Sequence, residues 1–130
     1  MSTIHIFGNP LLPFDSLPLK FVPKLKKIFP EIDFQLADPN ENLKPKNKKL
    51  FIIDTIEGIK EVVVVDDLSK INTEKAYSLH DFDLGFNLKL LQKIGELEEV
   101  LIIGVPMEVE DEEKTLNRIV EIIRNVSSRA

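Results

Sequence analysis

The sequence predicts an α/β protein, a three-layer α/β/α sandwich around a five-stranded, mostly parallel mixed sheet. Short apolar runs typical of buried strands alternate along the chain with segments whose apolar residues recur at helical spacing. No Gly/Ser-rich linker and no internal repeat divides the 130 residues, and this length is typical of one domain. We therefore expect a single domain over residues 1–130.

Five short segments have strand character, because they are rich in β-formers or apolar residues and have turn residues nearby. They are residues 3–7, 32–36, 50–53, 62–65 and 100–103. The last three are continuous apolar runs, which are typical of strands that are buried on both faces. Asp54 and Asp66 follow the first two of these runs, and Gly104 is expected to stop the third.

Three segments carry apolar residues at helical spacing, at residues 18–29, 83–94 and 115–126. Pro23 is expected either to kink the first helix or to delay its start, and Pro30 ends it. The acidic residues between positions 108 and 113 suit the N-terminal end of the last helix, where the helix dipole favours negative charge.

The fourth strand is expected to run antiparallel to the third. Asp54 and Asp66, which follow these two strands, are too close in sequence for a helical crossover, and Gly58 lies between them. The other strands are expected to be parallel. In sheets of this kind ligands bind beyond the carboxyl ends of the strands, where the predicted fold places Asp54.

Composition excludes several classes of function. The chain has 17 Lys and Arg against 22 Asp and Glu, a net charge of −5, which argues against a general affinity for nucleic acid. It has no cysteine, so disulfides, thiolate zinc sites and cysteine nucleophiles are excluded. No P-loop, GxGxxG or nucleophile-elbow pattern is present, so the sequence does not predict a nucleotide cradle or a hydrolase triad.

The location is expected to be the cytoplasm. The first residues lack the basic start and apolar core of a signal peptide, and no apolar stretch reaches the roughly 20 residues that cross a bilayer. No membrane partner is therefore expected. A composition rich in Lys, Glu and Ile without Trp or Cys is typical of a thermophile.

Three polar residues stand where the predicted fold would bring ligands together: Asp15 after the first strand, Asp54 after the third, and His80 before the second helix. Two carboxylates and an imidazole form a ligand set suited to zinc or nickel. Each residue also has a structural explanation, because Asp54 can cap backbone amides, His80 can bond within a loop and Asp15 can stabilise a turn. His5 alternates with isoleucines in a strand and is expected to be structural.

Four segments resemble, in chain order, the motifs of the nickel–iron hydrogenase maturation endopeptidases. IFGNPL, leading to Asp15, is similar to the strand and loop that open this family, and FIID, ending at Asp54, is similar to its second motif. SLH, ending at His80, resembles the third, and LIIGVP at residues 101–106 resembles a late strand with glycine and a proline turn. The chain departs from the family at its first site, where Phe14-Asp15-Ser16 replaces two acids and a glycine.

The resemblance implies an endopeptidase that removes a C-terminal extension from the large-subunit precursor of a nickel–iron hydrogenase after nickel insertion. Asp15, Asp54 and His80 would be both its catalytic and its metal-binding residues, contacting nickel that the substrate carries. The isolated protein would be able to hold zinc or another divalent ion instead. Two alternatives stay open: a non-catalytic metal-binding accessory protein of the same fold, and a small regulatory or nucleotide-binding α/β domain.

Overall fold

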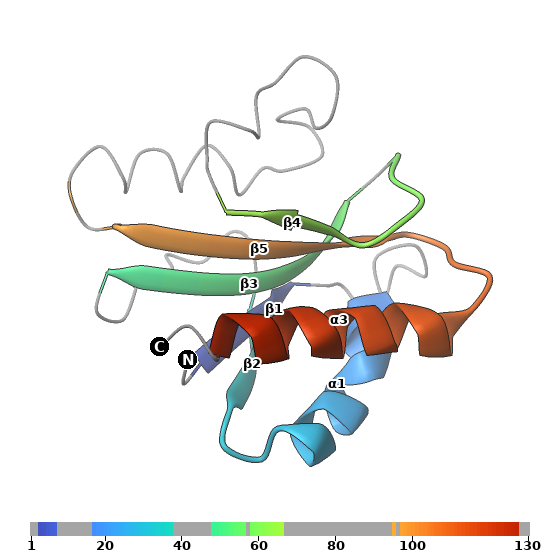
Figure 1. Ribbon diagram of the computed structural model, residues 1–130, viewed down its shortest axis with the longest axis horizontal. Helices are drawn as coiled ribbons and strands as arrows, with labels where there is room; N and C mark the ends of the chain where they lie inside the picture. Colours follow the sequence, from blue (N-terminus) through green and yellow to red (C-terminus); the bar gives the residue numbers. More distant parts are fainter. Residues whose placement is uncertain are drawn as a thin grey trace.

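The computed structural model describes residues 3–7, 17–37, 48–56, 58–66, 95 and 97–127. In chain order the elements are β1 (Thr3–Phe7), α1 (Leu17–Ile28), β2 (Asp33–Ala37), β3 (Lys49–Ile56), β4 (Val63–Val65), β5 (Glu99–Pro106) and α3 (Glu112–Ser127). The five strands form one sheet in the order β2-β1-β3-β5-β4, in which only β4 is antiparallel to its neighbour (Figure 1). The predicted α/β fold with a mostly parallel, five-stranded sheet is confirmed. The helix predicted at residues 83–94 lies outside the described residues.

Both faces of the sheet are buried. Helices α1 and α3 lie on one face (Figure 1), and their apolar side chains form a cluster with alternate residues of the central strands. The side chains of the opposite face form a second cluster: Phe7, Leu50, Ile52, Ile56, Val65, Leu97, Val100 and Ile102. Burial on both faces explains why the central strands are continuous apolar runs in the sequence. None of the helices in the described ranges is long and apolar enough to span a membrane.

Helix α1 begins at Leu17, so Pro23 lies inside it and does not delay its start. Leu17, Phe21 and Leu25 recur every four residues and are buried on the face that meets the sheet. Pro23 is exposed, so its missing N–H falls on the solvent side of the helix. The amphipathic pattern therefore dominates over the local preference of proline.

Strand β2 forms one edge of the sheet and pairs only with β1. Phe34 is buried, whereas the Leu36 side chain is 68% exposed although it follows the same alternation. Asp33 and Gln35 are exposed, and Gln35 Nε2 donates a hydrogen bond of 2.6 Å to Asp33 Oδ2.

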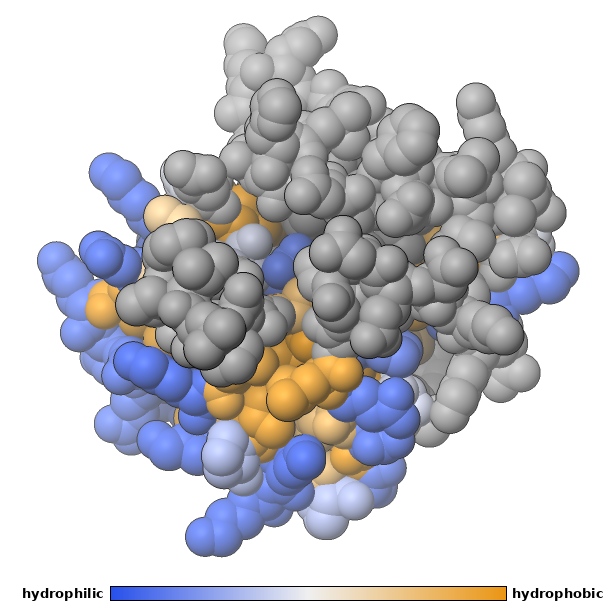
Figure 2. Space-filling view, turned by 180° about the vertical axis from the view of Figure 1, so that it is seen from behind, coloured by the Kyte–Doolittle hydropathy of each residue, from blue (hydrophilic) through white to orange (hydrophobic). Residues whose placement is uncertain are grey.

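Seen from behind, the hydrophobic residues of the described part gather near its centre and hydrophilic ones surround them (Figure 2).

The two central strands are longer than predicted. Strand β3 continues two residues past Asp54, and β5 runs through Gly104 to Pro106, because the two strands pair in parallel over their full eight residues. The expectation that Gly104 stops the strand is wrong. A Cβ at Gly104 would overlap the side chain of Ile56 and lie 2.8 Å from Val63 Cγ2, so glycine allows three strands to approach closely here.

Strand β4 runs antiparallel to the other strands, as the short connection predicts. It pairs with β5, with Val64 opposite Ile103, and not with β3, which precedes it in sequence. Gly58 has a φ of +87° in the connection, a conformation that L side chains rarely adopt. In the sheet, β5 therefore lies between β3 and β4.

Helix α3 begins at Glu112, three residues earlier than predicted. Asp111 is its N-cap: its Oδ1 accepts a hydrogen bond of 3.0 Å from the backbone N–H of Lys114. Glu112 and Glu113 lie in the first turn, which confirms that the acidic residues suit this end of the helix.

Candidate functional site

Asp54 lies where the order of the sheet reverses. From β1 the chain goes to β2 on one side, and β3 then pairs with β1 on the other. The pairing of β1 with β3 ends at Ile6 opposite Ile53, so Asp54 is the first residue of β3 beyond it. On its other side Asp54 is still paired in register with Gly104. In open α/β sheets this switch point, at the carboxyl ends of the strands, is where ligands bind.

The Asp54 carboxylate is held by the backbone next to it. The N–H of Thr55 donates a hydrogen bond of 2.8 Å to Oδ1 of Asp54, and the side chain is half-buried. The bond confirms that Asp54 caps a backbone amide. It involves one carboxylate oxygen, and it orients the group as hydrogen bonds orient metal-binding carboxylates in other proteins.

Strand alternation places Asp54 on the sheet face opposite α1 and α3. Its neighbours at spacing two, Ile52 and Ile56, both belong to the cluster of that opposite face. Gly104, the register partner on β5, adds no side chain beside the carboxylate. The Asp54 carboxylate therefore lies next to a residue of β5 that has no side chain.

Asp15 and His80, the other two predicted ligands, lie outside the described residues. Their convergence with Asp54 therefore stays a prediction. Among the residues that the structure describes, no three His, Asp or Glu side chains are grouped so that they could hold a metal ion. That set contains only one of the three predicted ligands.

His5, predicted to be structural, lies half-buried in β1 and is paired in register with Ile52. It shares its sheet face with Phe7 and hence with Asp54 on the neighbouring strand. Sequence alone does not show this proximity, because it depends on the order of the strands.

Thr55 is the neighbour of Asp54 on the other face of β3. Its Oγ1 atom is buried and has no hydrogen-bond partner among the residues that the structure describes. A buried hydroxyl without a partner lowers stability, and the sequence gives no signal for it.

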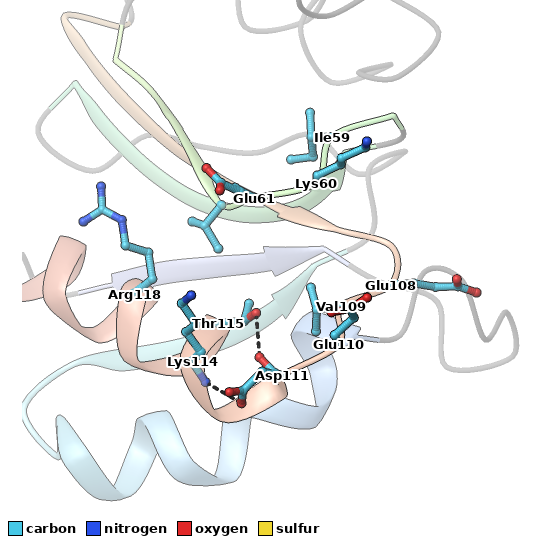
Figure 3. A pocket seen from close by; sticks show the side chains of 11 residues that line it. Ile59, Lys60, Glu61, Glu108, Val109, Glu110, Asp111, Lys114, Thr115 and Arg118 are labelled. Atoms are coloured by element: carbon cyan, nitrogen blue, oxygen red, sulfur yellow. Dashed lines mark hydrogen bonds between the residues drawn. The ribbon is translucent and has the colours of Figure 1, made fainter.

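A groove of about 660 Å³ lies at the carboxyl end of the sheet, on the side of α3 (Figure 3). Residues 59–62, which follow β3, form one rim. Residues 108–111, which follow β5, and the first two turns of α3 form the other.

A comparison with protein families decides the class of this chain. The family model described as hydrogenase maturation protease matches residues 38–130, which is more than half of the chain. The chain belongs to the hydrogenase maturation protease family. It is accordingly a hydrolase that acts on peptide bonds. The matched region includes Asp54 and His80 and begins after Asp15.

Solved structures extend the likeness of this maturation protease to nearly its whole length. The hydrogenase maturating endopeptidase HybD from E. coli is similar with a TM-score of 0.64 at 17% sequence identity, over 97% of this chain and 94% of that one. An uncharacterized protein from Wolinella succinogenes is similar with a TM-score of 0.62 at 11% identity, over 98% and 97% of the two chains. At these identities the likeness establishes the fold. No curated protein sequence matches the chain.

Proposed function

We propose that this maturation protease removes the C-terminal extension of a nickel–iron hydrogenase large-subunit precursor after nickel has been inserted. The proposal rests on one observation above all: in a chain of this family, Asp54 occupies the switch point at the carboxyl ends of the parallel strands. Asp15, between β1 and α1 in the sequence, and His80, before residues 83–94, complete the proposed site.

The proposed ligand set suits an ion that the substrate carries. Two carboxylates and one imidazole supply three ligands, so positions remain for groups of the precursor that already hold the nickel. A divalent ion supplies Lewis-acid polarisation of the carbonyl that is attacked. The isolated protein would bind zinc or another divalent ion with the same three residues, because oxygen and nitrogen ligands suit such ions.

Within this site, the role that we assign to Asp54 follows from its hydrogen bond. The Thr55 N–H holds Oδ1 in one orientation before the substrate arrives, so less conformational freedom is lost on binding. A precursor without nickel lacks the coordination bonds to all three residues and binds more weakly. Selection of the nickel-loaded precursor is then a difference of affinities.

The test is to incubate the purified protein with nickel-loaded precursor and to follow the loss of the extension by mass spectrometry. We expect the wild type to shorten the precursor. We expect His80→Ala to abolish processing with little change in melting temperature, because the sequence predicts this imidazole outside the strands and helices that form the core. Intact precursor after incubation with a folded wild type would favour the non-catalytic accessory protein instead.

A further inference from the structure

His5 is a half-buried histidine that the proposed site does not use. It lies in β1 on the sheet face opposite α1 and α3, between two register partners, Gln35 of β2 and Ile52 of β3. Of the residues that β1, β3 and β5 place on this face, only Thr3, His5 and Asp54 are polar. Partial burial of an imidazole costs free energy that an aliphatic side chain would avoid, so packing alone does not favour a histidine here.

The register of β1 and β3 places His5 diagonally across from Asp54. His5 is opposite Ile52, and Asp54 is two residues further along β3 on the same face. Adjacent strands lie about 4.8 Å apart and two residues of a strand span about 6.6 Å, so the Cα atoms of His5 and Asp54 are separated by about 8 Å. Diagonal neighbours at this spacing are within reach of an aromatic side chain.

His5 lies deeper in the sheet than Asp54, counted from the carboxyl ends of the strands. The pairing of β1 with β3 ends at Ile6 opposite Ile53, so the next residues, Phe7 and Asp54, stand at the same level. Phe7 is buried, and His5 is two residues before it. The imidazole is therefore behind the carboxylate and away from the end of the sheet where ligands bind. A role in the reaction from this place would be exerted through Asp54.

The Asp54 carboxylate can accept a hydrogen bond from an imidazole and still bind an ion. The Thr55 N–H bonds to Oδ1 at 2.8 Å and so fixes one of the two oxygens. A carboxylate has about four lone pairs, so a second donor leaves sites for a metal. A neutral imidazole carries one N–H donor, and hydrogen bonds to a ligating carboxylate orient it toward the ion.

We propose that His5 is a positioning residue of the site at Asp54: in the ion-bound protein its imidazole N–H donates a hydrogen bond to the Asp54 carboxylate and fixes the orientation of that group. The proposal rests on the function proposed above, in which Asp54 contacts a divalent ion. With the Thr55 N–H and the imidazole as donors, the carboxylate is held from two sides. Loss of the His5 donor leaves the fold intact and weakens the bond between Asp54 and the ion.

The experiment compares His5→Leu, which removes the donor, with His5→Gln, which keeps an N–H at similar reach. Gln35→Leu is the control, because Gln35 lies on the same face and at the same level as His5 but one strand further from Asp54. Isothermal titration calorimetry measures the affinity of each purified protein for zinc. We expect His5→Leu to weaken zinc binding about 10–100-fold, His5→Gln to recover most of it, and Gln35→Leu to leave it unchanged.

The melting temperature separates positioning from a purely structural role. Leucine suits the apolar surroundings of His5, so we expect His5→Leu to melt at or above the temperature of the wild type. A lower melting temperature with unchanged zinc affinity would make His5 structural and overturn the proposal. If His5→Leu does not fold, His5→Phe, a ring without an N–H, takes its place with the same expected loss of zinc affinity.

Processing of nickel-loaded precursor is the second readout. We expect kcat/KM to fall about tenfold or more in His5→Leu and to be largely restored in His5→Gln. A wild type that binds zinc but processes no precursor contradicts the proposed function, and the zinc affinities still decide the role of His5. If the wild type processes precursor without binding zinc, unchanged kcat/KM in His5→Leu overturns the positioning role. A wild type that does neither overturns both proposals.

Discussion

Asp54 and Thr55 are adjacent in β3, but their side chains lie on opposite faces of the sheet and have different roles. The backbone N–H of Thr55 orients the Asp54 carboxylate, while the Thr55 hydroxyl is buried and has no partner in the described part of the chain. Substitutions at the two positions therefore separate function from stability.

Asp54→Asn is expected to abolish processing while the protein stays folded. The amide oxygen of asparagine can still accept the Thr55 hydrogen bond, but the charge that binds a divalent ion is lost. Asp54→Ala also loses the bond and is expected to lower the free energy of unfolding by about 1 kcal/mol, which urea denaturation measures. Processing by Asp54→Asn at the wild-type rate would show that the carboxylate is structural.

Thr55→Val is expected to raise the free energy of unfolding by about 1 kcal/mol, because it replaces a buried hydroxyl, for which the described ranges offer no partner, with a methyl group of similar size. The backbone N–H that bonds to Asp54 remains, so processing is expected to be unchanged. Urea denaturation and the mass-spectrometric assay measure the two effects. Loss of processing in a stabilised Thr55→Val protein would instead give the hydroxyl a part in the reaction.

Among the elements, β3 and β5 form the longest ladder of the sheet and position Asp54 opposite Gly104. The close approach of Ile56 and Val63 leaves no room for a side chain at Gly104. The glycine is therefore a packing requirement of the centre of the sheet.

Gly104→Ala is expected to lower the free energy of unfolding by about 1–3 kcal/mol, since the new methyl group overlaps Ile56. Ile56→Val shortens that side chain and is expected to recover part of the loss when it is combined with Gly104→Ala. A double-mutant cycle in urea measures this coupling. Additive effects of the two substitutions would contradict the proposed contact.

The sequence predicted the existence of these elements better than their ends. The apolar runs of β3 and β5 were evident, but the ladder between the strands carries both past Asp54 and Gly104, and pairing of this length is not visible locally. Asp111 before α3 is an N-cap that the sequence does display, so the earlier start of that helix could have been predicted.

The same distinction applies to the candidate site. The end of an apolar run identified Asp54, whereas its position at the switch point depends on β1 pairing with β2 and β3 on either side. Strand order is a long-range property, and for the same reason the nearness of His5 to Asp54 could not be predicted.

Across the whole molecule, the two ends of the sheet have different roles. At the amino end of the paired strands, Lys48 and Lys49 form ion pairs of 3.8 and 3.6 Å with Glu98 and Glu99. These pairs are more than half exposed and contribute at most about 1 kcal/mol each. The carboxyl end carries Asp54, the described member of the proposed site.

Asp15, Asp54 and His80 are proposed to select a precursor by the nickel it carries. The most direct measurement is to incubate the purified protein with nickel-free and with nickel-loaded precursor and to compare the loss of the extension by mass spectrometry. We expect cleavage of the nickel-loaded form alone, because Asp15, Asp54 and His80 then gain coordination bonds that the nickel-free form cannot offer. Equal cleavage of both forms would contradict the claim.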